Sequence, residues 1–299
     1  MDQRPEKLSG ADVSLKAYIQ GYAYAVPEGL GLDAVPPAMG TVFDVRPLLK
    51  DKKSFKVMSK QDALAVYTAV NAIRKSGLPE SAVANDTGIY ITVGILPFED
   101  EPLDVLYKES LKDGRFDMES FSTKAYHSLN PLLTFKCLPN MPLFHVSSNL
   151  GMHGRYYITY PGREQWFMSL QQALVDLACG RVSHALVGAV ADQRNLLARH
   201  HLDRLPGGTA DAVDCGVMLV LGRERNDNSI ASIKLDSMSY SPRDPFREGA
   251  AAMARLPVHT GPAEPGLFIA LSLEKTAPKI EYCLDNSGGF SGRCQVRAL

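Results

Sequence analysis

Residues 140–189, NMPLFHVSSNLGMHGRYYITYPGREQWFMSLQQALVDLACGRVSHALVGA, decide the fold of this chain. Within them a strand-like run, Tyr156 to Tyr160, meets a turn at Pro161-Gly162. The apolar residues after the turn are spaced three, four and three apart, which predicts a helix: Phe167, Leu170, Leu174 and Leu177. Gly180 is expected to end this helix, and Ala185 to Gly188 to form the next buried strand.

The turn between this strand and this helix has the geometry of a nucleophile site. A strand, a sharp turn and a helix present one side chain above the helix N-terminus, where a reactive group can be held. The residue at that position is Arg163, followed by Glu164 and Gln165. An arginine cannot attack a thioester, so the sequence predicts the frame of a nucleophile site without a nucleophile.

The composition predicts a soluble, cytoplasmic protein with a sizeable core. The chain has 299 residues, 45% of them hydrophobic, and 32 basic against 33 acidic residues give a net charge of -1. This balance argues against nucleic acid or an anionic membrane as the main partner. The segment from Met1 to Lys7 is charged with no apolar segment behind it, and no apolar run approaches the roughly 18–20 residues of a membrane span. The five cysteines include no CxxC pair and are expected to be small core residues, without a metal or a disulfide framework.

Alternating strand-like and helix-like segments predict one α/β unit over residues 1–299. A strand starts at Leu15, a helix covers Ser59 to Ser76, and another helix lies near Leu103 to Leu111. Further strands are predicted at 88–94, 215–221, 230–240, 279–284 and 293–298, with a short helix at 267–274. The alternation indicates a mainly parallel sheet covered by helices, with an N-terminal half of about residues 1–195 and a C-terminal half of about 196–299.

Short motifs occur along the chain in a characteristic order. They are Phe43-Asp-Val-Arg-Pro47, Ser76-Gly-Leu78, Asn140-Met141, Gly151-Met-His-Gly154, the run from Gly180 to Gly188, and Asn286-Ser-Gly-Gly-Phe-Ser-Gly292. In this order and spacing they resemble the β-ketoacyl synthase branch of the thiolase-like family. The resemblance implies a layered α/β/α or α/β/α/β/α thiolase-like fold, shortened in its second half.

The departures from the family pattern concern its catalytic groups. In active members a Cys at the strand-helix turn accepts the acyl group, and two His residues activate malonyl for decarboxylation. The Cys position falls here on Arg163, and the family's His-Gly-Thr-Gly-Thr segment is absent. His259-Thr260-Gly261 resembles the second His site only faintly. The resemblance therefore implies a member without the condensing apparatus, not an enzyme on its own, with no catalytic residue, cofactor or metal.

Relatives that keep this fold and lose the Cys are the chain-length factors of type II polyketide synthases. The resemblance implies a ketosynthase partner, in a heterodimer or a dimer of heterodimers, and an acyl carrier protein that is met through the complex. The chain would then shape the tunnel in which malonyl units are condensed into a polyketide or polyene. Its shortened second half is similar to that of chain-length factors from aryl-polyene and anthraquinone pathways.

The same resemblance assigns roles to particular residues. Tyr156, Tyr157, Ile158, Thr159 and Tyr160 are similar to the family strand that pairs across the dimer axis, with ordinary core as the alternative. Leu132, Leu133 and Phe135 match a stretch near the acyl channel and would serve equally as plain core, whereas Gly162 and Glu164 would line the vacated site. Arg163 either fills that site, contacts another subunit or points to solvent.

Other interpretations of the sequence remain open. His200-His201, within the basic run Arg194 to Arg204, is either a solvated helix end or a patch for an acidic carrier protein. An active synthase would need another nucleophile, and the nearby thiols are Cys137 and Cys179. A stand-alone acyl-binding or scaffold protein is the alternative from another functional class.

Overall fold

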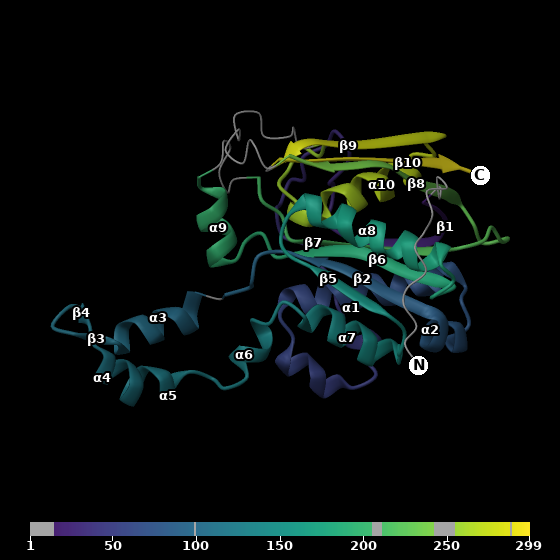
Figure 1. Cartoon of the computed structure of the whole chain (residues 1–299). Coiled ribbons are helices and arrows are strands. Elements are labelled where there is room, and N and C mark those ends of the chain that lie inside the picture. Colours follow the sequence, from purple (N-terminus) through teal and green to yellow (C-terminus); the bar gives the residue numbers. More distant parts are fainter. Residues whose placement is uncertain (1–14, 99, 205–210, 242–254, 288) are drawn as a thin grey trace.

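A computed structural model describes residues 15–98, 100–204, 211–241, 255–287 and 289–299. Its main sheet has eight strands in the order β5-β2-β6-β7-β1-β8-β10-β9 (Figure 1). The predictions that concern Met1 to Lys7, and Gly288 in the last motif, lie outside the described residues. No helix of the described segments is long and apolar enough to cross a membrane.

The first five strands in this order form the base of the sheet. They are β5 (Tyr156–Thr159), β2 (Thr87–Val93), β6 (His184–Ala191), β7 (Cys215–Gly222) and β1 (Lys16–Ala25). β5 and β6 run parallel to β2, whereas β7 is antiparallel to both β6 and β1. The prediction of a mainly parallel sheet is therefore wrong.

The antiparallel direction of β7 follows from how it is connected to β6. A parallel neighbour needs a crossover that carries the chain back across the sheet. The helix in this connection, α9 (Leu196–Leu202), is only seven residues long, and β7 starts beside the residue where β6 ended, with Ala191 opposite Cys215. The chain therefore turns back along the strand it has just completed.

The other three strands continue the same sheet. β8 (Ala231–Tyr240) pairs with β1 and with β10 (Phe290–Ala298), and β10 pairs with β9 (Lys279–Ser287), all antiparallel. Asn286 and Ser287 of the last motif therefore belong to β9, and Phe290 to Gly292 belong to β10.

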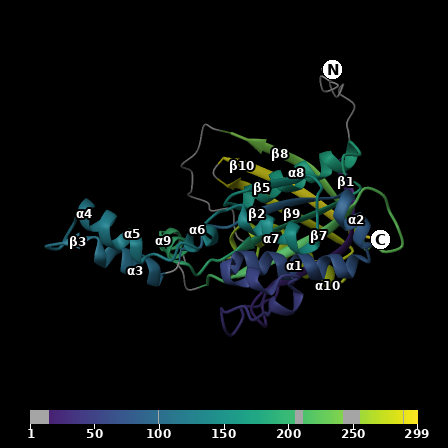
Figure 2. The same ribbon diagram turned by 90° about the horizontal axis from the view of Figure 1, so that it is seen from below.

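The helices and the sheet form four layers, α/β/α/β. The single eight-stranded sheet supplies both β layers, one from its first five strands and one from β8, β10 and β9. In Figure 1, α8 (Arg163–Ala178) and α10 (Glu264–Glu274) lie between β9 and β10 above and β6 and β7 below. Figure 2 shows α1 (Lys60–Ser76) and α7 (Met141–Leu150) across the opposite face of the first strands. The first core cluster fills the space around α8 and α10, and the second lies under α1 and α7. The layered α/β fold expected from the sequence is confirmed.

The outer face of β8, β10 and β9 carries no further helical layer among the described residues. Its outward positions alternate with buried ones and are largely charged: Lys234, Asp236, Glu281, Asp285, Arg293 and Arg297. Lys234 pairs with Asp236 and Arg293 with Glu281. A charged face of this kind is stable in contact with water, so this β layer needs no further layer to cover it.

Local signals set the predicted helices. Ser59 and Asp62 form a capping box at the start of α1, and Gly77, in the left-handed conformation with φ 67°, ends it. Trp166, one turn into α8, is fully buried in the first core cluster. Cys215 and Cys294 are buried as expected, whereas Cys179 is exposed beyond the end of α8.

Residues 100–140, called the arm below, project from the layered body in both views (Figures 1 and 2). The arm contains α3 (Asp100–Glu109), the hairpin β3 (Leu111–Lys112) and β4 (Arg115–Phe116), α4 (Met118–Ser120), a π-helical turn η3 (Phe121–Ala125), α5 (Tyr126–Ser128) and α6 (Leu133–Lys136). The predicted helix near Leu103 to Leu111 corresponds to α3. The remaining elements are α2 (Glu80–Asp86) and the short helices η1 (Arg46–Leu48), η2 (Lys52–Val57) and η5 (Gly261–Ala263).

Candidate functional site

The strand-turn-helix element predicted from the sequence is present. β5 ends at Thr159, the Tyr160-Pro161 peptide bond is cis, and Gly162 is the N-cap of α8. Arg163 is therefore the first residue of α8, the position at which this geometry presents a side chain. Glu164 follows within the first turn, where a carboxylate interacts favourably with the helix dipole, and its Oε2 lies 3.4 Å from Ser287 Oγ.

Arg163 turns inward and pairs with a buried glutamate. Its Nη1 lies 3.0 Å from Oε2 of Glu264, the first residue of α10, and the two side chains are 20% and 3% exposed. Glu264 Oε1 also accepts hydrogen bonds from the hydroxyl of Tyr282 at 2.8 Å and the backbone N–H of Arg255 at 2.9 Å. A buried ion pair of this kind is tolerated because further donors satisfy its remaining lone pairs.

A triangle of hydroxyl groups lies behind this turn. The hydroxyl oxygens of Thr92 of β2, Thr159 of β5 and Ser169 of α8 lie 2.9–3.1 Å from one another. Thr159 donates its proton to the carbonyl of Gln165, so within the triangle it accepts from Thr92 or Ser169. All three side chains are buried. The triangle ties the end of β5 to the first turns of α8 and so fixes the direction in which Arg163 leaves the helix.

β5 is one of the two edges of the main sheet. It pairs on one side with β2, and its other side carries no strand of the described residues. Tyr156 is 72% exposed and Tyr160 40%, Tyr157 and Ile158 are half-buried, and Thr159 is buried. Of the five residues predicted to form an interface strand, Tyr156 and Tyr160 are therefore exposed to solvent in the structure.

The start of β5 is anchored from inside the body. Asp176 of α8, itself buried, accepts hydrogen bonds from Arg155, Tyr90, Arg181 and Gln172. Burial alone raises the pKa of this carboxyl, but the bonds from Arg181, Tyr90 and Gln172 outweigh burial and lower it. Arg155 immediately precedes β5, so the hub formed by Asp176 holds the edge strand against α8.

Leu132, Leu133 and Phe135 belong to the arm and do not share one environment. Leu132 and Phe135 are exposed, whereas Leu133 lines an apolar pocket of about 420 Å³. The other apolar walls of that pocket include Phe98, Tyr126, Leu129 and Leu138, and Cys137 also lines it. The structure therefore places these residues at the base of the arm, and Gly162, Arg163 and Glu164 in the body.

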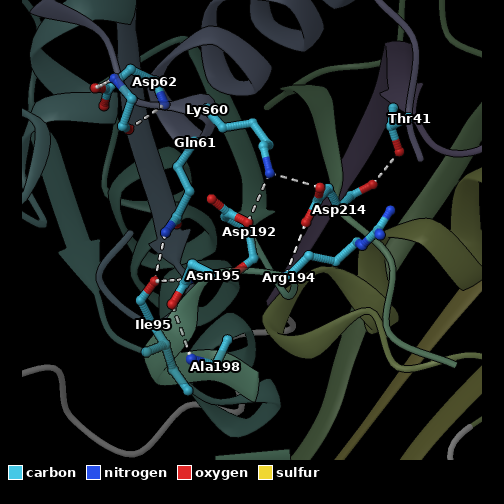
Figure 3. Close-up of polar contacts among 11 residues, drawn as sticks. Thr41, Lys60, Gln61, Asp62, Ile95, Asp192, Arg194, Asn195, Ala198 and Asp214 are labelled. Atoms are coloured by element: carbon cyan, nitrogen blue, oxygen red, sulfur yellow. Dashed lines mark hydrogen bonds and ion pairs between the residues drawn. The ribbon is translucent and has the colours of Figure 1, made fainter. Parts of the chain in front are cut away.

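Sequence reasoning missed a charged cluster beyond the C-terminal ends of the interior strands β2 and β6 (Figure 3). Lys60 Nζ lies 3.1 Å from Oδ1 of Asp192 and 2.9 Å from Oδ2 of Asp214, and both carboxylates are more than nine-tenths buried. Burial, followed by the charge of Asp214, raises the pKa of Asp192 to about 6. Burial would lower the pKa of Lys60, but the two carboxylates together raise it.

The cluster connects several segments of the chain at these strand ends. Asp214 Oδ1 accepts from the backbone N–H of Arg194, and its carbonyl accepts from the hydroxyl of Thr41. Gln61 donates to the carbonyl of Ile95, beside the start of the arm, and Asn195 caps α9 (Figure 3). The sequence signal was present, because Asp192 directly follows one buried strand and Asp214 directly precedes another.

A second buried titratable pair lies between α1 and α7. His145 Nε2 lies 4.0 Å from Oδ2 of Asp62, and both side chains are almost fully buried. Burial raises the pKa of Asp62 to about 7 and lowers the pKa of His145 to about 4. Across the described ranges, no group of three or more His, Cys, Asp or Glu side chains is placed to hold a metal ion.

No protein-family model and no curated protein matches this sequence. Solved structures match its fold. The AntDE ketosynthase, solved with its type II polyketide synthase acyl-carrier protein AntF, aligns at a TM-score of 0.70 and 11% identity over 96% of this chain and 100% of that one. The chain shares the ketosynthase fold.

Two further solved structures agree with this result. A β-ketoacyl synthase from Burkholderia phymatum aligns at a TM-score of 0.64 and 12% identity, over 95% of this chain and 99% of that one. The ishigamide ketosynthase/chain length factor aligns at 0.59 and 14%, again over 95% and 99%. Identities this low show the thiolase-like ketosynthase architecture and leave the roles of individual residues to the site itself.

Proposed function

We propose that this chain is a non-catalytic subunit that pairs with a ketosynthase in the cytoplasm and acts as its chain-length factor. One observation carries the proposal. The position at which this fold presents its nucleophile holds Arg163, and a buried ion pair with Glu264 fixes that side chain. An always-protonated guanidinium cannot accept an acyl group, so the condensation chemistry belongs to the partner.

The two edges of the sheet differ in a way that supports a partner at β5. Exposed edge strands are usually protected by charged residues, because unpaired strands attract other strands. β9, at the far edge, carries Lys279, Glu281 and Asp285, whereas β5 consists of Tyr156, Tyr157, Ile158 and Thr159. An uncharged edge with an exposed tyrosine is suited to pairing with another subunit.

The arm provides a second surface of this kind. Its large apolar side chains that are open to solvent are Val105, Tyr107, Phe116, Met118, Tyr126, Leu132, Phe135 and Leu138. So many exposed apolar groups on one projecting segment are typical of an interaction surface. In the proposed complex the arm lies against the ketosynthase, and Leu132, Leu133 and Phe135 contribute to the wall that limits the growing chain.

The basic residues of α9 provide a place for the carrier protein. His200 and His201 of α9 are exposed, as are Arg194 before the helix and Arg204 after it, whereas Leu202 is buried. In the proposed complex this patch attracts an acidic acyl carrier protein towards the ketosynthase. The aryl-polyene or anthraquinone type of pathway remains part of the proposal as well.

Co-expression tests the pairing. The tagged chain is produced alone and together with ketosynthases of its own genome, and the products are compared by size-exclusion chromatography with light scattering. We expect poor solubility alone and a stable heterodimer, or dimer of heterodimers, with one ketosynthase. A soluble monomer or homodimer that retains no ketosynthase would contradict the proposal.

The apolar pocket at the base of the arm favours a second candidate, a stand-alone acyl-binding protein. A concave apolar site of about 420 Å³ is within the range of small-molecule sites. This candidate predicts that the chain alone binds a fluorescent fatty-acid probe and that Leu133→Asp abolishes binding. Absence of probe binding by the soluble chain would exclude it.

A further inference from the structure

Arg163 and Glu264 connect the first residues of two helices that are distant in the sequence. α8 and α10 pack together within the first core cluster, and the ion pair joins their N-terminal ends. Both N-termini carry partial positive charge, which favours the carboxylate and disfavours the guanidinium. Glu264 therefore supplies the negative charge that allows Arg163 to sit at the start of α8.

We infer that Glu264 is a second determinant of the inert site, one that would keep it inert even if a thiol replaced Arg163. This inference rests on the proposed function and extends it, because it explains how loss of the nucleophile is maintained by a residue on another helix. Glu264 Oε2 lies 3.0 Å from Nη1 of Arg163, and the glutamate side chain is 3% exposed. The sulfur of a cysteine at position 163 lies nearer the helix backbone than Nη1 does, so the carboxylate acts on it across a few ångströms of a largely buried site and not by direct contact.

The electrostatic reason is a comparison of two charges. A helix N-terminus stabilises a thiolate through roughly half a positive charge. A buried carboxylate a few ångströms away contributes a full negative charge, which favours the protonated thiol. With Glu264 present, a thiol at this position stays protonated and unreactive at neutral pH.

Glu264 is not free to turn away. Its Oε1 is held by the hydroxyl of Tyr282 and the backbone N–H of Arg255, leaving Oε2 towards Arg163. Burial, and then the charge of Glu264, raise the pKa of Tyr282 well above its ordinary value, so the phenol remains a hydrogen-bond donor.

The test compares Arg163→Cys with the double variant Arg163→Cys/Glu264→Gln. Iodoacetamide labelling at several pH values is followed by peptide mass spectrometry, which separates the introduced thiol from the exposed Cys179. We expect the introduced thiol to be labelled at pH 7 at least about tenfold more slowly in the single variant, a difference of one pKa unit or more. Equal rates in both variants would overturn the inference.

A second measurement does not depend on the folding of the single variant. Phenylglyoxal modification of Arg163 is compared between the wild-type chain and Glu264→Gln, with exposed Arg194 as internal reference. We expect modification of Arg163 relative to Arg194 to be several-fold faster in Glu264→Gln. An unchanged ratio would show that Glu264 does not act on the side chain at position 163, and would overturn the inference at its premise. The proposed function is tested separately, since neither labelling result depends on a ketosynthase partner.

Discussion

Arg163 and Glu264 form an ion pair, with Nη1 and Oε2 3.0 Å apart, at the strand-turn-helix element where β5 leads into α8. The pair connects the start of α8 to the start of α10, so it is part of the core as well as of the site that we propose has lost its nucleophile. It therefore has consequences both for stability and for chemistry.

Glu264→Gln leaves the guanidinium of Arg163, which is 20% exposed, beside a neutral amide. Removing one partner of a buried ion pair destabilises by about 3–5 kcal/mol, and we expect the lower end because the amide oxygen can still accept from Tyr282. The matched control is Glu274→Gln at the exposed end of the same helix, where the amide oxygen can still accept from the hydroxyl of Tyr24, with an expected change within about 0.5 kcal/mol. The free energy of unfolding is measured in urea. Equal effects of the two variants would show that Arg163 does not depend on Glu264.

Asp192 makes stability depend on pH. The pKa of Asp192 is raised to about 6 in the folded chain, above that of an unfolded aspartate, so the folded chain binds the proton more tightly. The stabilisation of the folded chain by this proton is fully present below about pH 4 and is lost as the pH rises through 6. Asp192→Asn resembles the protonated form. We therefore expect the wild-type chain to lose about 3 kcal/mol relative to this variant between pH 4 and pH 7.

The measurement is thermal or urea unfolding at fixed ionic strength across that range. Asp227→Asn, in an exposed turn, is the matched control for a lost carboxylate. A difference between wild type and Asp192→Asn that is constant with pH would mean that the carboxyl pair with Asp214 does not bind a proton in this window.

The titration of His145 should change the free energy of unfolding with pH in the opposite direction. Burial lowers its pKa to about 4, so its contribution is present above the unfolded value near 6.5 and is lost as the pH falls towards 4. We expect His145→Gln to gain about 3 kcal/mol relative to the wild-type chain on acidification from pH 7 to 4. The same titration of unfolding free energy measures it, with exposed His200→Gln as control, and parallel curves for His145→Gln and wild type would refute the assignment.

The edge strand β5 can be tested without disturbing the core. Tyr156→Lys places a charge on the exposed edge, and we expect a stability change within about 0.5 kcal/mol but at least about tenfold weaker binding to the ketosynthase. Lys279→Glu on the opposite edge strand is the control and should leave binding unchanged. Binding of each variant to surface-immobilised ketosynthase is measured by surface plasmon resonance. Equal affinity of both variants would show that β5 is not part of the interface.

The sequence predicted the parts of the fold that depend on local pattern. The helix predicted from Ser59 to Ser76 corresponds to α1, and the spacing from Phe167 to Leu177 identified α8. Strand direction was not predictable in this way, because it depends on whether a connection crosses the sheet, and the pairing of Ala191 with Cys215 is set only when β6 and β7 come together.

The site was predicted in the same partial way. The position of Arg163 follows from the turn before α8, but its partner Glu264 lies 101 residues later and carries no local signal. The cluster of Lys60, Asp192 and Asp214 likewise joins residues far apart in the sequence. Long-range pairs of this kind emerge only when the layers are assembled.

Intact-protein mass spectrometry of the co-purified complex, after incubation with an octanoyl thioester, tests the central claim most directly. The account predicts that the ketosynthase gains one acyl group and that this chain, with Arg163 paired to Glu264, gains none. An acyl adduct on this chain would contradict it.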